Sequence, residues 1–174
     1  MSTDIKHQID SADISERLVG ITPICLNNFV QRGLFGLKPS IQSGKLRAKR
    51  RCFSRDDVFG IALVWLLFES GLRTVPIIGV LKDITKTPKA NPNANLAAKK
   101  LLESGADYLL IVRQPRTPRK SPEEEPDQIV QPLAKGKLSD AVQQHADSEL
   151  LVIPVGAKFA DVRKRLELLF PESK

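Results

Sequence analysis

The stretch GITPICLNNFVQRGL, residues 20–34, decides how the first half of this chain is expected to fold. Thr22 is a residue type that caps helices, and Pro23 suits the first helical turn because an N–H at that position has no intrahelical partner. Gly33 supplies a stop, because glycine readily ends a helix. The stretch therefore predicts a short helix between Thr22 and Gly33.

This predicted helix has two different faces. The apolar face consists of Cys25, Leu26, Phe29 and Val30. The opposite face, at spacing i, i+3, i+4 and i+7, consists of Ile24, Asn27, Asn28 and Gln31. Amide side chains can pair bidentately with adenine in the major groove of DNA, which makes Asn27, Asn28 and Gln31 candidate base contacts. The alternative is that the three amides are simply solvated residues on an exposed helix face.

The segments on either side of this helix suggest a DNA-binding arrangement. A helix near residues 14–19 precedes it, and Gly20 breaks the chain between the two, which is helix-turn-helix spacing. After it, residues 37–41 and 50–53 are predicted to form a hairpin. Seven basic residues and no acidic residue lie between Lys38 and Arg55. Such a hairpin is either a solvated loop or a phosphate-binding wing, and the lack of any acid favours the wing.

The candidate phosphate contacts combine the cap of the predicted helix with the basic residues of the hairpin. They are Thr22, Lys38, Lys45, Arg47, Lys49, Arg50 and Arg51. Contacts to phosphate fix affinity and its dependence on salt, whereas sequence is read at the base edges.

A strongly apolar helix is predicted from residue 54 to residue 70. Ser54 and Asp57 have the spacing of a capping box, and Gly71 ends the segment. Because the helix is apolar nearly all round, it must be covered on most sides. We expect the cover to come from the C-terminal half or from a second subunit. A further helix is predicted to begin at Thr74.

The rest of the chain predicts an α+β fold in several parts. We expect a flexible tail at 1–12, a winged helix-turn-helix domain at 13–85, a linker at 86–93, and a small α+β domain at 94–174. In the last part, helices are predicted at 93–103, 139–146 and 158–170, strands at 108–112, 129–133 and 150–155, and a mobile loop at 114–128. The apolar stripe predicted for the final helix is Phe159, Val162, Leu166, Leu169 and Phe170. This domain is expected to serve dimerisation or regulation, with an unidentified effector or protein partner.

A family resemblance covers residues 14–81. The residues that carry it are Gly20-Ile21-Thr22-Pro23, Leu26, Phe29, Gly33-Leu34, Arg51-Cys52-Phe53-Ser54, Asp57-Val58, Gly71 and Leu81. In order and spacing they resemble the winged helix-turn-helix domain of the mercury-resistance-regulator (MerR) family of bacterial transcription factors. The resemblance implies a DNA-binding regulator with its recognition helix in the major groove and a wing on the phosphate backbone.

The chain also departs from that family. Asn27-Asn28-Phe29-Val30 stand where the family usually has Arg-Tyr-Tyr-Glu, and Pro88 and Pro92 interrupt the region of the usual dimerisation coiled coil. No cysteine follows Cys52, so the metal sensing of the founding members is not supported.

Composition agrees with a protein that binds polyanions and not with an enzyme. The 174 residues carry a net charge of +7, which favours nucleic acid or an acidic surface as partner. The sequence has no metal-ligand spacing and no phosphate-cradling glycine loop, so no catalytic residue, metal or cofactor is expected. The lack of a leader or a membrane-spanning run predicts a cytoplasmic, nucleoid-associated protein.

The predicted function is sequence-specific binding of double-stranded DNA by a homodimeric transcription regulator. The alternative is a protein-interaction adaptor that uses the winged helix as a scaffold. RNA binding is a weaker variant, because aromatic residues make up only 5% of the chain.

Overall fold

The computed structural model describes residues 9–43, 49–87, 91–113 and 128–171, which form an α+β fold. In the first half, the elements are β1 (Ile9–Asp10), α1 (Ser11–Asp13), the π-helical turn η2 (Ile14–Leu18), α2 (Pro23–Gln31), the 3₁₀ turn η3 (Leu34–Gly36), β2 (Ser40–Ser43), β3 (Lys49–Phe53), α3 (Arg55–Glu69) and α4 (Thr74–Thr85). In the second half they are α5 (Ala94–Glu103), β4 (Tyr108–Arg113), β5 (Gln128–Leu133), the 3₁₀ turn η4 (Lys135–Lys137), α6 (Leu138–Gln144), β6 (Glu149–Ile153) and α7 (Val155–Leu169).

The described structure begins within the predicted tail at 1–12, of which residues 1–8 lie outside the described part of the chain. Ile9 is fully buried and pairs with Phe53 in an antiparallel ladder, so residues 9–12 are not part of a tail. The first helix is capped by Asp10, whose carboxylate accepts hydrogen bonds at 2.9 Å from the backbone N–H groups of Ala12 and Asp13. It therefore begins at residue 11 and not near residue 14, because the side chain that satisfies its first N–H groups lies further upstream.

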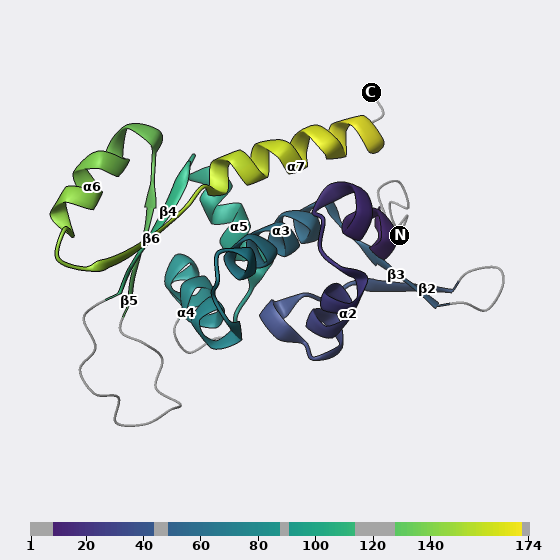
Figure 1. The fold of residues 1–174 in the computed structure, drawn as a ribbon. Helices are drawn as coiled ribbons and strands as arrows, with labels where there is room; N and C mark the ends of the chain where they lie inside the picture. The colour runs from purple at the N-terminus through teal and green to yellow at the C-terminus, as the bar shows by residue number, and fades with distance from the viewer. Residues whose placement is uncertain (1–8, 44–48, 88–90, 114–127, 172–174) are drawn as a thin grey trace.

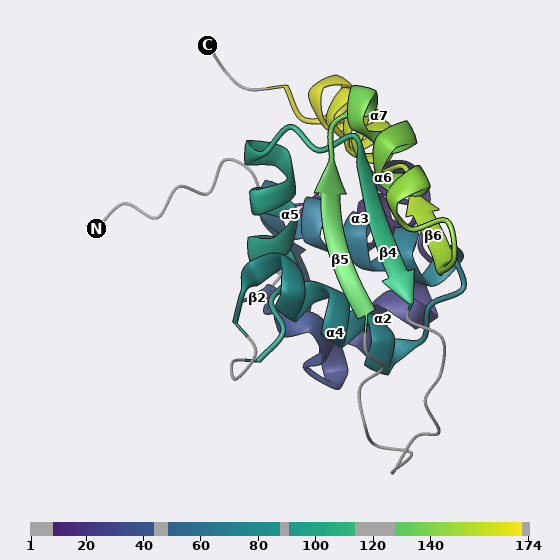
Figure 2. The same ribbon diagram turned by 90° about the vertical axis from the view of Figure 1, so that its left-hand side faces the viewer.

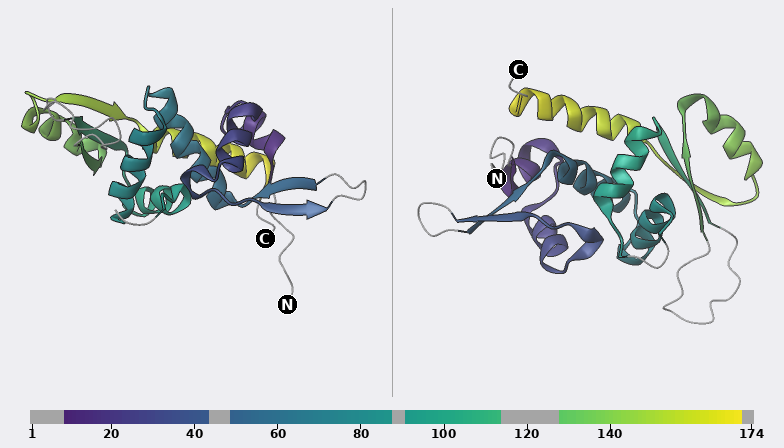
Figure 3. Two further views of the ribbon diagram at one scale, coloured as in Figure 1. Left: turned by 90° about the horizontal axis from the view of Figure 1, so that it is seen from below. Right: turned by 180° about the vertical axis from the view of Figure 1, so that it is seen from behind.

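The predicted helix α2 forms with the expected ends. The Thr22 hydroxyl accepts a hydrogen bond from the Cys25 N–H at 3.3 Å, and Gly33 follows the helix with φ of 60°. Strands β2 and β3 then form an antiparallel hairpin in a sheet of order β1-β3-β2. Figure 3 shows this hairpin projecting from the body, at the end of the molecule opposite to α6.

Helix α3 lies at the centre of the molecule. The predicted capping box is confirmed: the Ser54 hydroxyl accepts from the Asp57 N–H, and the Asp57 carboxylate accepts from the Ser54 N–H. The helix packs against α4, α5 and α7, and Figure 1 shows α7 running across it. Of the two predicted sources of cover, the chain's own second half supplies α5 and α7, and α4 of the first half adds to them.

One apolar core joins the two halves of the chain on either side of the expected linker at 86–93. Buried side chains from before it, such as Phe53 and Ile61, belong to the same cluster as Leu101, Leu109 and Phe159 from after it. Residues 88–90 of that linker lie outside the described part of the chain. The packing therefore makes α3 the shared centre of both halves.

The second sheet has the antiparallel order β5-β4-β6 (Figure 2). Its central strand β4 is buried on both faces, which explains its continuous apolar sequence. Leu109 and Ile111 join the main core, whereas Leu110 and Val112 pack in a smaller cluster with Ala141 of α6. The sheet is thus held between the main core and α6.

Helix α7 begins three residues before its predicted start and buries a shorter stripe than predicted. Phe159, Val162 and Leu166 are buried, but Leu169 is 41% exposed. Phe170, one residue further along, packs against the core in its place. The predicted burial of Leu169 was wrong. The main core ends at this point of α7, and of the neighbours Leu169 and Phe170 only Phe170 packs against it.

Candidate nucleic-acid interface

Helix α2 presents its polar face to solvent. Asn27, Asn28 and Gln31 are exposed, and the Ile24 side chain on the same face is 74% exposed. On the opposite face Leu26 and Phe29 are buried. The structure therefore brings the three predicted base contacts together on one outward surface.

Phe29 fixes the rotation of α2 about its own axis. Its ring packs edge-on against Phe35, with ring centroids 5.2 Å apart and an interplanar angle of 88°. A second contact, with centroids 6.0 Å apart, joins it to Phe68 of α3. Because edge-to-face aromatic contacts are directional, this pair of partners holds the amide face outward.

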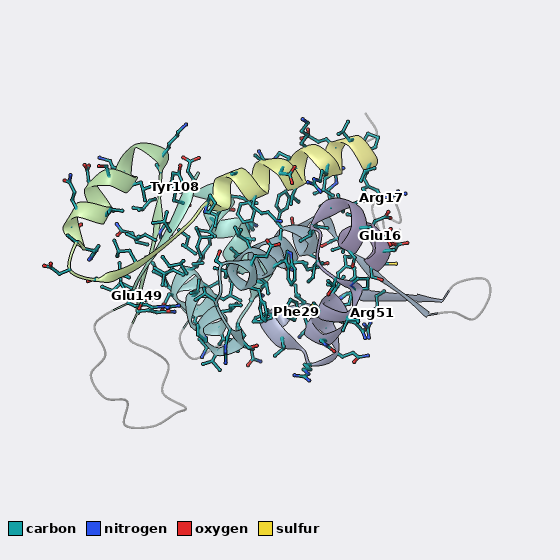
Figure 4. The ribbon with its side chains drawn as sticks, in the orientation of Figure 1. Glu16, Arg17, Phe29, Arg51, Tyr108 and Glu149 are labelled. Atoms are coloured by element: carbon teal, nitrogen blue, oxygen red, sulfur yellow. The ribbon has the colours of Figure 1, made fainter. Side chains whose placement is uncertain are left out.

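An open groove of about 430 Å³ lies between α2, the N-terminal helical segment and β3. It is lined by Ser11, Ala12, Glu16, Pro23, Ile24, Leu26, Asn27, Val30, Arg51 and Phe53. Figure 4 shows Glu16 and Arg51 at the end of the molecule that holds α2, whereas Tyr108 and Glu149 lie at the other end. The groove thus adjoins the amide face and the root of the hairpin.

A hydrogen bond across this groove joins two predicted site residues. The Arg51 Nη1 of β3 donates to the Asn27 Oδ1 of α2, 24 residues earlier in the chain. Asn27 was predicted to contact bases and Arg51 to contact phosphate. Their direct contact could not be found from spacing, because it depends on how the hairpin folds back onto the helix.

The other predicted phosphate contacts fall into three groups. Thr22 and Lys38 are exposed, and the Thr22 hydroxyl is already used as the helix cap. Lys49 and Arg50 lie in β3, of which the structure describes the backbone at these positions. Two predicted contacts lie outside the described residues, Lys45 and Arg47. The described backbone of the hairpin therefore starts beside α2 and extends away from it.

Of the ten residues that line the groove, only Asn27 and Arg51 were predicted as site residues, and Ile24 and Glu16 are among the other eight. Ile24 was placed on the amide face but not among the site residues, although an apolar side chain in the major groove can contact the methyl group of thymine. Glu16 contributes an exposed carboxylate from η2. It belongs to the π-helical turn, which has no clear sequence signal.

Arg55, the last residue of the basic run, has a structural contact. Its guanidinium donates through Nη2 to the Phe170 carbonyl at the end of α7. It therefore ties α3 to the C-terminal helix.

Both cysteines of the chain lie in the described residues. Cys25 is half-buried and Cys52 is buried, and the two are not joined by a disulfide. Within the described ranges, no three His, Cys, Asp or Glu side chains come together in a group that could hold a metal ion. Among the same residues, no helix is long and apolar enough to cross a membrane.

Comparison with known proteins adds no family assignment. No protein-family model matches the chain, and no curated protein matches it.

Proposed function

We propose that this protein binds double-stranded DNA in a sequence-specific manner and regulates transcription. In this proposal, α2 enters the major groove and the β2–β3 hairpin lies along the phosphate backbone. The observation that carries the proposal is the exposed amide face of α2 beside the root of a hairpin whose sequence is basic without an acidic residue. The order helix, turn, helix, hairpin also agrees with the proposed resemblance to MerR-family regulators.

The two parts of this surface would have separate tasks. Amides on α2 would distinguish base pairs, at about 1–3 kcal/mol for each good contact. Basic residues of the hairpin would supply affinity for any duplex and make binding sensitive to salt. Backbone affinity would thus come mainly from the hairpin, because α2 has no basic residue between Pro23 and Gln31.

The test is selection of bound duplexes from a random pool, followed by titration of the selected site and of a scrambled duplex. We expect the Asn28→Ala/Gln31→Ala variant to bind the selected site about 10-fold or more weakly, because each lost base contact is worth about 1–3 kcal/mol. Its affinity for the scrambled duplex should stay the same. Gln143→Ala/Gln144→Ala is the matched control, because these amides are also exposed but lie on α6 at the far end of the molecule. Equal losses in both variants would refute the assignment of α2.

We also propose that the DNA-binding form is a homodimer. A single helix of nine residues offers few base contacts, and regulators of this kind gain specificity by reading two half-sites. Burial of α3 gives no support to this point, because α4, α5 and α7 cover it. Selected sites should be palindromic, with half-site centres about one helical turn or a multiple of it apart. Non-repeated sites bound by one chain would contradict the dimer.

A further inference from the structure

The contact between Arg51 and Asn27 determines which end of the Asn27 amide faces outward. A guanidinium has N–H donors and no acceptor, so the atom that meets it must be the amide oxygen. The amide nitrogen, with its two N–H donors, is consequently turned away from Arg51. Asn27 is exposed and Arg51 is partly exposed, so the nitrogen lies at the surface of α2 and not in the core.

This orientation conflicts with the usual way in which asparagine reads adenine. In that contact the amide oxygen accepts from adenine N6 while the amide nitrogen donates to N7. Here the oxygen is already bonded to a cation, and charge-assisted hydrogen bonds are roughly twice as strong as neutral ones. An adenine N6 amino group would therefore meet an amide whose outward end is also a donor.

We propose that Arg51 is a positioning residue that makes Asn27 a donor toward DNA, so that Asn27 selects guanine over adenine. Guanine presents two acceptors in the major groove, N7 and O6, to which the amide N–H groups can donate. Adenine presents one acceptor beside a donor. The inference rests on the proposed function and specifies which base one residue reads.

Two substitutions should change the preferred base in different ways. Asn27→Asp keeps the size of the side chain, and its carboxylate can still pair with Arg51, but the outward atom becomes an acceptor. The preferred base at the contacted position should then change from guanine to cytosine, whose N4 amino group is a donor. Arg51→Met frees the amide to turn over, so adenine should become acceptable at the same position.

Asn28→Asp is the matched control. Asn28 is the next residue of the same exposed face, and among the described residues its side chain has no hydrogen-bond partner. Its carboxylate should lower affinity without converting a guanine into a cytosine at the position that Asn27 contacts. Thermal unfolding of each variant establishes that it is folded before binding is measured.

The experiment is selection from a random duplex pool with the wild type and the three variants, followed by titration of single-base substitutions. We expect the wild type to prefer guanine over adenine by roughly 5- to 100-fold at one position, the discrimination of one good base contact. A wild type that prefers adenine at this position, or an Asn27→Asp variant with the same preferred base as the wild type, would overturn this inference. Either result would leave the proposed DNA binding intact. Failure of the wild type to enrich any duplex would overturn the proposed function together with it.

Discussion

Replacing Gly60 by alanine should destabilise the protein strongly, because α3 and α5 touch at this residue. A Cβ at Gly60 would overlap the Asn95 Oδ1 and would lie 3.0 Å from the Asn95 backbone nitrogen and 3.1 Å from the Ala94 carbonyl carbon. The side chain of Asn95 has little freedom to yield, since its Nδ2 donates to the buried Asp57 carboxylate at 2.5 Å. The added methyl group therefore overpacks the contact between the two helices and also displaces the amide that makes this hydrogen bond.

The expected loss can be worked from these contacts. Overpacking of a core costs about 1–3 kcal/mol, and loss of a hydrogen bond to a charged group costs about 1.5–3 kcal/mol. Alanine gains about 0.5–1 kcal/mol over glycine inside a helix, which offsets part of the loss. We therefore expect Gly60→Ala to lower the free energy of unfolding by about 2–4 kcal/mol.

Urea titration measures this change, followed by circular dichroism and by the fluorescence of Trp65, the single tryptophan of the chain. Gly136→Ala is the control, because a Cβ there would meet no atom within 4 Å, and it should change stability by less than about 0.5 kcal/mol. Asn95→Ala removes the overlapping oxygen, so the double variant should lose less than the sum of the two single losses. A Gly60→Ala protein as stable as the wild type would refute the close approach of the two helices.

Two further predictions concern the cap of the first helix and the basic hairpin. Asp10→Ala should lower the free energy of unfolding by about 1 kcal/mol, whereas Asp10→Asn keeps an acceptor oxygen and should lose less; equal unfolding midpoints for alanine and wild type would contradict the cap. Lys49→Gln/Arg50→Gln should reduce the slope of log affinity against log salt by about 1.8 if both residues meet phosphate, since each contact contributes about 0.9. Lys135→Gln/Lys137→Gln removes the same charge from exposed positions beside α6, and a change of slope as large as that of the hairpin variant would refute the wing.

The features that were predictable from sequence are those that a few neighbouring residues determine. Thr22, Pro23 and Gly33 bound α2 in the way that their cap and stop preferences predict. Asn93 caps α5 by accepting from the Leu96 N–H at 2.9 Å, at the start predicted for that helix. Burial on α2 also follows periodicity, because a face with Leu26 is favoured inside and a face with three amides is favoured outside.

The contacts that could not be predicted join residues far apart in the chain. Arg51 contacts Asn27 only because the hairpin folds back onto α2. A run of basic residues does not by itself indicate which of them donates a hydrogen bond to an amide. The shared core was one of two alternatives left open for covering α3, because periodicity shows that a helix needs cover but not which segment supplies it. Proline-rich residues near 86–93 indicated a boundary, but short breaks between helices carry the same composition whether the helices separate or pack together.

The contact of α7 with η2 has a consequence for the order in which the chain can fold. The Lys158 ammonium donates to the Val19 carbonyl at 3.1 Å, and Arg165 donates to the Arg17 carbonyl at 3.3 Å. Cations from the last helix thus satisfy carbonyl groups at the C-terminal end of the first helical segment, a task that neighbouring residues usually perform. During synthesis, the proposed DNA-reading face leaves the ribosome early, but its supporting helix stays without these partners until residue 165 has emerged. The contacts that satisfy these two carbonyl groups can therefore form only after α7 has been synthesised.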